Sequence, residues 1–226
     1  MDWLVGIMER LLAPDGCPWD REQTLETLRP YLVEECYEVL EAIDSGDREQ
    51  HREELGDLLL QIVFQAQIAG IPMAGVIRSI GEKLIRRHPH VFADTSVADS
   101  SEVVTNWEAI KATEKAAGKR PSSVFDGVPR ALPALHLSHK LVRRATKSGV
   151  ALPDPRTEVE ARMSATDRCA QAPGRAGTAE AFGDLLFALA SWATSLEVEP
   201  EQALRDAARH FTDRIEAQLS TKRRAD

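Results

Sequence analysis

Acidic residues gather in two short motifs in the first third of the chain, and both motifs lie among apolar residues. The first motif is Glu34-Glu35-x-x-Glu38 and the second is Glu54-x-x-Asp57. Like charges among aliphatic side chains repel one another and resist the loss of water unless a cation neutralises them. Oxygen ligands without histidine suit a hard cation, Mg²⁺ or Mn²⁺, rather than zinc. The two motifs therefore predict a metal site.

The helices that carry these motifs must bring them to the same height for one ion to contact both. Apolar residues recur at helical spacing through residues 24–43, although Pro30 can instead place the helix start near residue 29. The next predicted helix covers residues 48–69. With about 1.5 Å of rise per residue, both motifs lie roughly 10 to 18 Å from the intervening turn of an antiparallel pair. The carboxylates expected to converge are Glu35, Glu38, Glu54 and Asp57.

Two interpretations of the acidic motifs remain open at this point. Glutamate-rich helical segments are often solvated faces that bind nothing. Glu35, however, falls within the apolar stripe of Leu32 and Val39, and Asp57 begins an apolar run. Four carboxylates are more negative than one dication needs, so we expect two or more ions, or one ion and a substrate that brings another.

Composition favours a bundle of helices. The 226 residues are 43% hydrophobic but only 5% aromatic, which is typical of packed helices rather than of a β-sandwich. The net charge of −8 argues against a nucleic-acid polymer as partner. Three widely spaced cysteines indicate a reducing compartment, and neither a signal peptide nor a membrane-spanning apolar run is recognisable. We therefore expect an all-α, cytoplasmic protein with no membrane partner.

Glycine and proline divide the chain into two predicted domains, residues 1–117 and 132–226, with a linker at 118–131. The sequence Gly-Asp-Leu-Leu at residues 56–59 returns at residues 183–186, which indicates a tandem repeat. Ala181 stands where the first copy has Glu54, so the second copy is expected to hold no metal. The remaining helices are predicted over residues 2–13, 76–87, 102–117, 132–147, 179–196 and 201–219.

Cations and an aromatic residue follow the acidic motifs. Lys83, Arg86 and Arg87 lie near the end of the helix predicted at 76–87, and Lys83 and Arg87 share a helical face. These cations either bind phosphate groups or only complement the helix dipole. Trp107 either packs in the core or stacks on a nucleobase. A metal site with nearby cations suits a phosphate-bearing substrate.

Four motifs in order resemble the MazG family of nucleoside triphosphate pyrophosphohydrolases. They are Gly16-Cys17-Pro18-Trp19-Asp20, the two acidic motifs, and the segment Arg86-Arg87-His88-Pro89-His90-Val91-Phe92. The resemblance is close over residues 1–117 and implies an all-α, usually dimeric enzyme that hydrolyses nucleoside triphosphates to monophosphate and pyrophosphate. Nucleotide-pool sanitation is the expected role.

The resemblance also implies roles for individual residues. Magnesium ligands are expected at Glu35, Glu38, Glu54 and Asp57. Substrate contacts are expected at Lys83, Arg86, Arg87 and Trp107, with water attacking the α-phosphorus. Glu34 or Glu38 is expected to accept the proton, and their spacing does not decide between them. The alternative function is a non-catalytic helical module that dimerises or binds a regulator.

Overall fold

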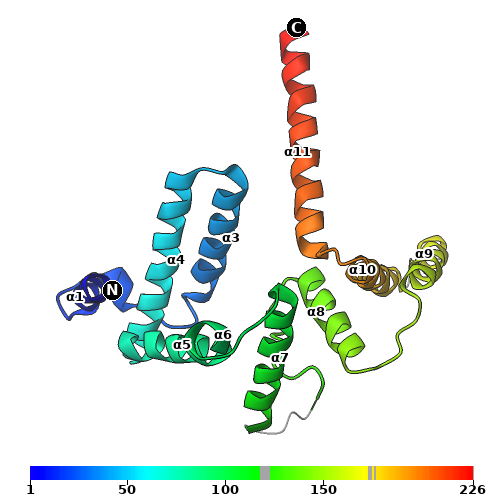
Figure 1. Cartoon of the computed structure of the whole chain (residues 1–226). Helices are drawn as coiled ribbons and strands as arrows, with labels where there is room; N and C mark the ends of the chain where they lie inside the picture. The colour runs from blue at the N-terminus through cyan, green and yellow to red at the C-terminus, as the bar shows by residue number, and fades with distance from the viewer. Residues whose placement is uncertain (118–122, 173–174, 176, 226) are drawn as a thin grey trace. The chain divides into compact units, whose positions relative to one another are not determined.

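The computed structural model describes the whole chain except residues 118–122, 173–174, 176 and 226. The described residues form helices and contain no strand (Figure 1), which confirms the predicted all-α class. The helices are α1 (Asp2–Leu12), α2 (Pro18–Arg21), α3 (Arg29–Ser45), α4 (Arg48–Ile68), α5 (Met73–Arg87), α6 (Pro89–Phe92), α7 (Ser100–Ala117), α8 (Ala134–Lys147), α9 (Pro155–Gln171), α10 (Thr178–Ser195) and α11 (Pro200–Ala225).

The chain divides into two compact units, residues 1–114 and 115–226. Part of the linker predicted at 118–131 lies outside the described residues. The interpretation of residues 132–226 as a degenerate repeat stays a prediction.

The core of the first unit forms between α1, α4 and α5. Met8 of α1, Val63 and Phe64 of α4, and Met73 of α5 are buried together with Leu28, which immediately precedes α3. Helix α5 turns away from α4 by 116° after the break at residues 69–72. This core fixes α4, and α4 in turn carries the second acidic motif.

The turn between α3 and α4 sets the register of the two acidic motifs. Gly46 ends α3 in the left-handed conformation with φ of 73°, which glycine adopts without steric cost. Asp47 caps α4 because its side chain accepts hydrogen bonds from the backbone N–H groups of Glu49 and Gln50, at 2.9 and 3.2 Å. A two-residue connection between antiparallel helices leaves little freedom for one helix to slide along the other.

Two helix boundaries bear on the sequence-based expectations. Helix α3 begins at Arg29, which confirms the alternative start near residue 29 and excludes the start at residue 24, so Pro30 occupies the first turn, where its missing N–H costs nothing. Helix α5 begins at Met73, three residues earlier than expected.

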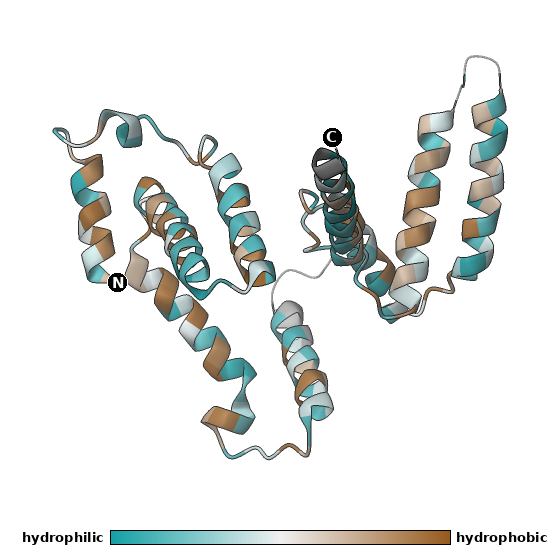
Figure 2. Ribbon diagram, turned by 90° about the horizontal axis from the view of Figure 1, so that it is seen from above, coloured by the Kyte–Doolittle hydropathy of each residue, from teal (hydrophilic) through white to brown (hydrophobic). Residues whose placement is uncertain are grey.

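The second unit contains a helix that was not predicted. Helix α9 pairs with α10, and Val159 and Ala188 are buried there. Asp154 caps α9 by accepting the N–H of Thr157 at 2.8 Å, and Pro155 follows at the first helical position. In Figure 2 the colouring changes between hydrophobic and hydrophilic along the helices, as expected for amphipathic segments.

Candidate active site

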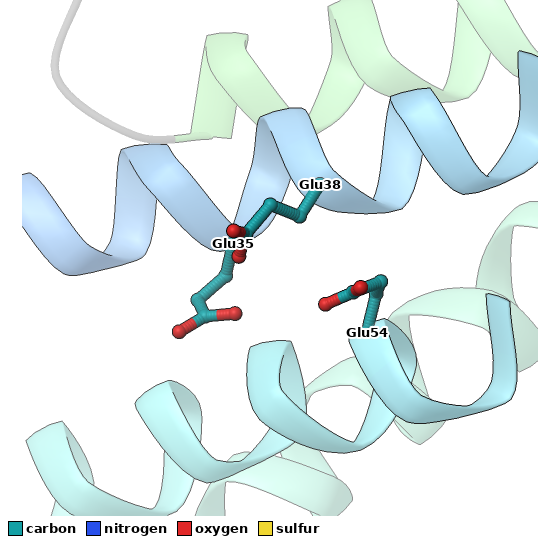
Figure 3. A group of neighbouring side chains, drawn as sticks. All are labelled: Glu35, Glu38 and Glu54. Atoms are coloured by element: carbon teal, nitrogen blue, oxygen red, sulfur yellow. The ribbon is translucent and has the colours of Figure 1, made fainter. Parts of the chain in front are cut away.

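Three of the predicted metal ligands meet between α3 and α4. One carboxylate oxygen from each of Glu35, Glu38 and Glu54 lies within 4.8 Å of the others. Figure 3 shows that the side chains of Glu35 and Glu38 from α3 and of Glu54 from α4 gather in the space between the two helices. All three are half-buried, so they are not simply members of a solvated face.

Asp57, the fourth predicted ligand, is not one of the three carboxylates that approach one another, but its charge repels both Glu35 and Glu54. The pKa of Glu35 is raised, first because burial disfavours its charge, and then because Asp57, Glu38 and Glu54 repel it. The pKa of Glu54 is raised by partial loss of water and by repulsion from Glu38 and Asp57. A cation placed among carboxylates that repel one another stabilises their ionised forms. The all-oxygen donor set therefore fits a hard divalent ion.

Glu34 occupies a different position from the cluster. Its side chain is exposed, and it is not among the three carboxylates that approach one another. Glu38 is the predicted proton acceptor that the structure places inside the cluster.

The predicted phosphate-binding arginines contact a carboxylate that was not anticipated. Arg86 Nε donates to Glu114 Oε1 at 2.6 Å, and Arg87 Nη2 donates to Glu114 Oε2 at 2.6 Å. These hydrogen bonds lower the pKa of Glu114 to about 2, so Glu114 is anionic at neutral pH. Lys83 lies half-buried on α5, one helical turn before Arg87.

Trp107 lies beside two cations. The Nζ atom of Lys111 is 4.1 Å from the centre of the Trp107 ring, and the Cζ atom of Arg87 is 5.6 Å from it. Lys111 was not among the predicted site residues. The spacing of Trp107 and Lys111, four residues apart on one helix, is the sequence signal that could have found it.

The second unit has no comparable acidic cluster among its described residues. Asp184, which matches Asp57 in the repeated sequence, accepts a hydrogen bond from Arg162 Nη1 at 2.8 Å. Arg162 Nε also donates to Glu158 at 3.2 Å. An arginine therefore supplies the positive charge beside Asp184.

Comparisons with known proteins show the family to which the chain belongs. A family model described as the MazG nucleotide pyrophosphohydrolase domain matches residues 23–92, which include both acidic motifs and the arginines of α5. A relative from Thermotoga maritima, the nucleoside triphosphate pyrophosphohydrolase/pyrophosphatase MazG, is 44% identical over 94% of this chain and 82% of its own length. The chain belongs to the MazG family. This confirms the family expected from the four motifs and makes the protein an enzyme of the nucleotide pyrophosphohydrolase class.

Two further similarities were found, one to a curated relative and one to a solved structure. The nucleoside triphosphate pyrophosphohydrolase of Escherichia coli is 42% identical over 95% of this chain and 85% of its own length. Among solved structures, a MazG-related protein from Thermotoga maritima is 31% identical, with a TM-score of 0.44, and covers 50% of this chain and 99% of that chain.

Two further observations bear on the sequence-based expectations for this MazG chain. The three cysteines, Cys17, Cys36 and Cys169, are free. Among the described residues, no single helix is long and apolar enough to cross a membrane, although two bent pairs of consecutive helices reach the required length and composition together.

Proposed function

We propose that the protein hydrolyses nucleoside triphosphates to nucleoside monophosphate and pyrophosphate with Mg²⁺ held by Glu35, Glu38, Glu54 and Asp57. The observation that carries the proposal is the approach of three carboxylate oxygens to within 4.8 Å of one another across α3 and α4. The names of the Thermotoga maritima and Escherichia coli relatives support the same reaction.

The donor set supports a magnesium site, with Mn²⁺ as a possible substitute. When bound, such an ion supplies positive charge that neutralises the carboxylates and the triphosphate and lowers the pKa of a nearby water.

The residues of the chain supply the remaining chemistry. A water oxygen forms a bond to the α-phosphorus, and the bond from that phosphorus to the bridging oxygen of the pyrophosphate breaks. Glu38, within the cluster, accepts the proton of the water. Lys83, Arg86 and Arg87 bind the phosphate oxygens and stabilise their developing charge. Trp107 stacks on the base, with Lys111 beside it.

Release of pyrophosphate from a mixture of deoxynucleoside triphosphates tests this function. The wild type is expected to release pyrophosphate with Mg²⁺, and Glu38→Ala is expected to lose this activity. Glu41→Ala is the matched control, because Glu41 is exposed on the same helix and lies outside the cluster. A folded wild type that releases no pyrophosphate, or an active Glu38→Ala variant, contradicts the proposal.

We further propose that the enzyme is a homodimer. Ile77, Ile80 and Leu84 follow helical spacing along α5 and are 45%, 46% and 47% exposed. An apolar stripe of this kind is typical of an interface between protein chains. The second unit, as a degenerate repeat without metal, is proposed to support this assembly.

Intracellular nucleotides as substrates and three free cysteines support a cytoplasmic role in nucleotide-pool sanitation.

A further inference from the structure

We propose that Glu114 is a positioning residue that holds the guanidinium group of Arg87 in place for the triphosphate. This inference rests on the proposed function, because it takes the end of α5 as the phosphate-binding part of the site. It adds a residue of α7, 27 positions after Arg87, to the residues that determine substrate affinity.

Two hydrogen bonds to Glu114 fix the plane of the Arg87 guanidinium group. Arg87 donates from Nε at 3.1 Å and from Nη2 at 2.6 Å to Oε2 of Glu114. Two donors on one edge of a planar guanidinium fix its plane, as in other bidentate arginine–carboxylate pairs. The hydrogen bonds that Arg87 donates to the described residues come from Nε and Nη2. The edge of the guanidinium that carries Nη1 is therefore left for a phosphate oxygen.

Partial burial separates this pair from ordinary surface ion pairs. The side chains of Arg87 and Glu114 are only 19% and 21% exposed, whereas Arg86 is 54% exposed. Exposed pairs hold their geometry weakly because water competes and the long side chains remain mobile. The Arg87–Glu114 contact is therefore the part of this network that positions a group.

One face of α7 carries Glu114 together with the aromatic ring and the lysine of the proposed base-binding site. Trp107, Lys111 and Glu114 follow each other at intervals of four and three residues, so their side chains leave the helix on the same side. The Arg87 guanidinium contacts Glu114 and also lies 5.6 Å from the Trp107 ring centre. Glu114 thus fixes the relation between the base-stacking residue of α7 and the cations of α5.

Glu114 could instead compete with the substrate for Arg87, and its removal would then change substrate affinity in the opposite direction. A carboxylate that competes with phosphate for Arg87 weakens substrate binding, and its removal strengthens binding. A positioning carboxylate strengthens binding, and its removal weakens it. The direction of the change in KM therefore separates the two roles.

The experiment compares Glu114→Ala, Glu114→Gln and the neighbouring control Thr113→Ala. Thr113 is exposed, and among the described residues its hydroxyl donates to the carbonyl groups of Ala109 and Ile110 in its own helix. We expect Glu114→Ala to raise KM roughly tenfold, the size of one lost charge-assisted hydrogen bond, with kcat little changed. Glu114→Gln, which keeps an accepting oxygen, should recover part of the loss, and Thr113→Ala should match the wild type.

A double variant tests whether Glu114 acts through Arg87. If it does, adding Glu114→Ala to Arg87→Ala raises KM no further. A lower KM in Glu114→Ala, an unchanged KM, or full additivity with Arg87→Ala overturns the proposal. Thermal stability is measured in parallel, because a purely structural role lowers stability without this pattern in KM.

Binding of a non-hydrolysable α,β-methylene nucleoside triphosphate separates this proposal from the proposed function. If the wild type binds the analogue but releases no pyrophosphate from substrates, the hydrolytic function fails. The Kd ratio of Glu114→Ala to wild type then still decides the role of Glu114. A wild type that neither binds the analogue nor hydrolyses substrate overturns both, and a wild type that hydrolyses substrate while Glu114→Ala is unchanged overturns the positioning role alone.

Discussion

Repulsion within the acidic cluster should lower the free energy of unfolding of the metal-free protein. Replacing Glu35 by glutamine should remove part of this repulsion and raise that free energy. Oxygens of Glu35 and Glu38 lie within 4.8 Å of each other. Two unit charges at that separation repel by about 0.9 kcal/mol with the dielectric constant of water and by about 3.5 kcal/mol at an effective value near 20. Since both side chains are half-buried, we expect Glu35→Gln to stabilise the metal-free protein by roughly 1 kcal/mol.

The pH dependence of this cost follows from the direction of the pKa shift. Burial and neighbouring carboxylates raise the pKa of Glu35 in the folded state. The folded state therefore binds more protons than the unfolded state between the ordinary pKa and the raised one. The cost of the charged cluster is complete above the raised pKa and is relieved as the pH falls through it.

Thermal unfolding with and without Mg²⁺ measures both parts of the prediction. In the metal-free state near neutral pH, Glu35→Gln should raise Tm by roughly 4 °C, as about 1 kcal/mol does for a unit of this size. Mg²⁺ at about 100 times its Kd should stabilise the wild type by about 2.7 kcal/mol, and this effect should be largely lost in the variant. Glu41→Gln should behave as the wild type. A variant that is less stable without metal, or that keeps the full response to Mg²⁺, refutes the reasoning.

Three further outcomes follow from the structure. Mg²⁺ affinity, measured by calorimetry, should fall as the pH is lowered, because protons compete for Glu35; an affinity independent of pH contradicts this. Removing the cap of α4 in Asp47→Ala should cost about 1 kcal/mol in chemical denaturation, and an unchanged midpoint argues against the capping role. Ile80→Glu should convert a dimer into monomers in light scattering, whereas an unaltered mass places the interface elsewhere.

Local patterns in the sequence predicted the cluster because its geometry depends on one short turn. The motifs are separated by a connection whose glycine and capping aspartate are recognisable, so helical rise alone gives the approach of Glu35, Glu38 and Glu54. Glu34 shows the limit of this reasoning, because its neighbour Glu35 points into the cluster and Glu34 is exposed.

Contacts between distant segments were beyond sequence reasoning. Glu114 lies 27 residues from Arg87, and nothing in the local pattern of α7 distinguishes it from a solvated glutamate. Helix α9 was missed for a different reason. The segment around it is rich in glycine and alanine, so it lacks a clear apolar stripe. The helix-start signal of Asp154 followed by Pro155 was therefore not recognised.

We propose that the carboxylate cluster of α3 and α4 directs water to the α-phosphorus of nucleoside triphosphates. Hydrolysis in water enriched in oxygen-18, with mass spectrometry of both products, tests this attack most directly. We expect one labelled oxygen in the nucleoside monophosphate, none in the pyrophosphate, and no labelled product from Glu38→Ala. Label in the pyrophosphate, release of single phosphates, or undiminished labelling by Glu38→Ala contradicts attack at the α-phosphorus by this cluster.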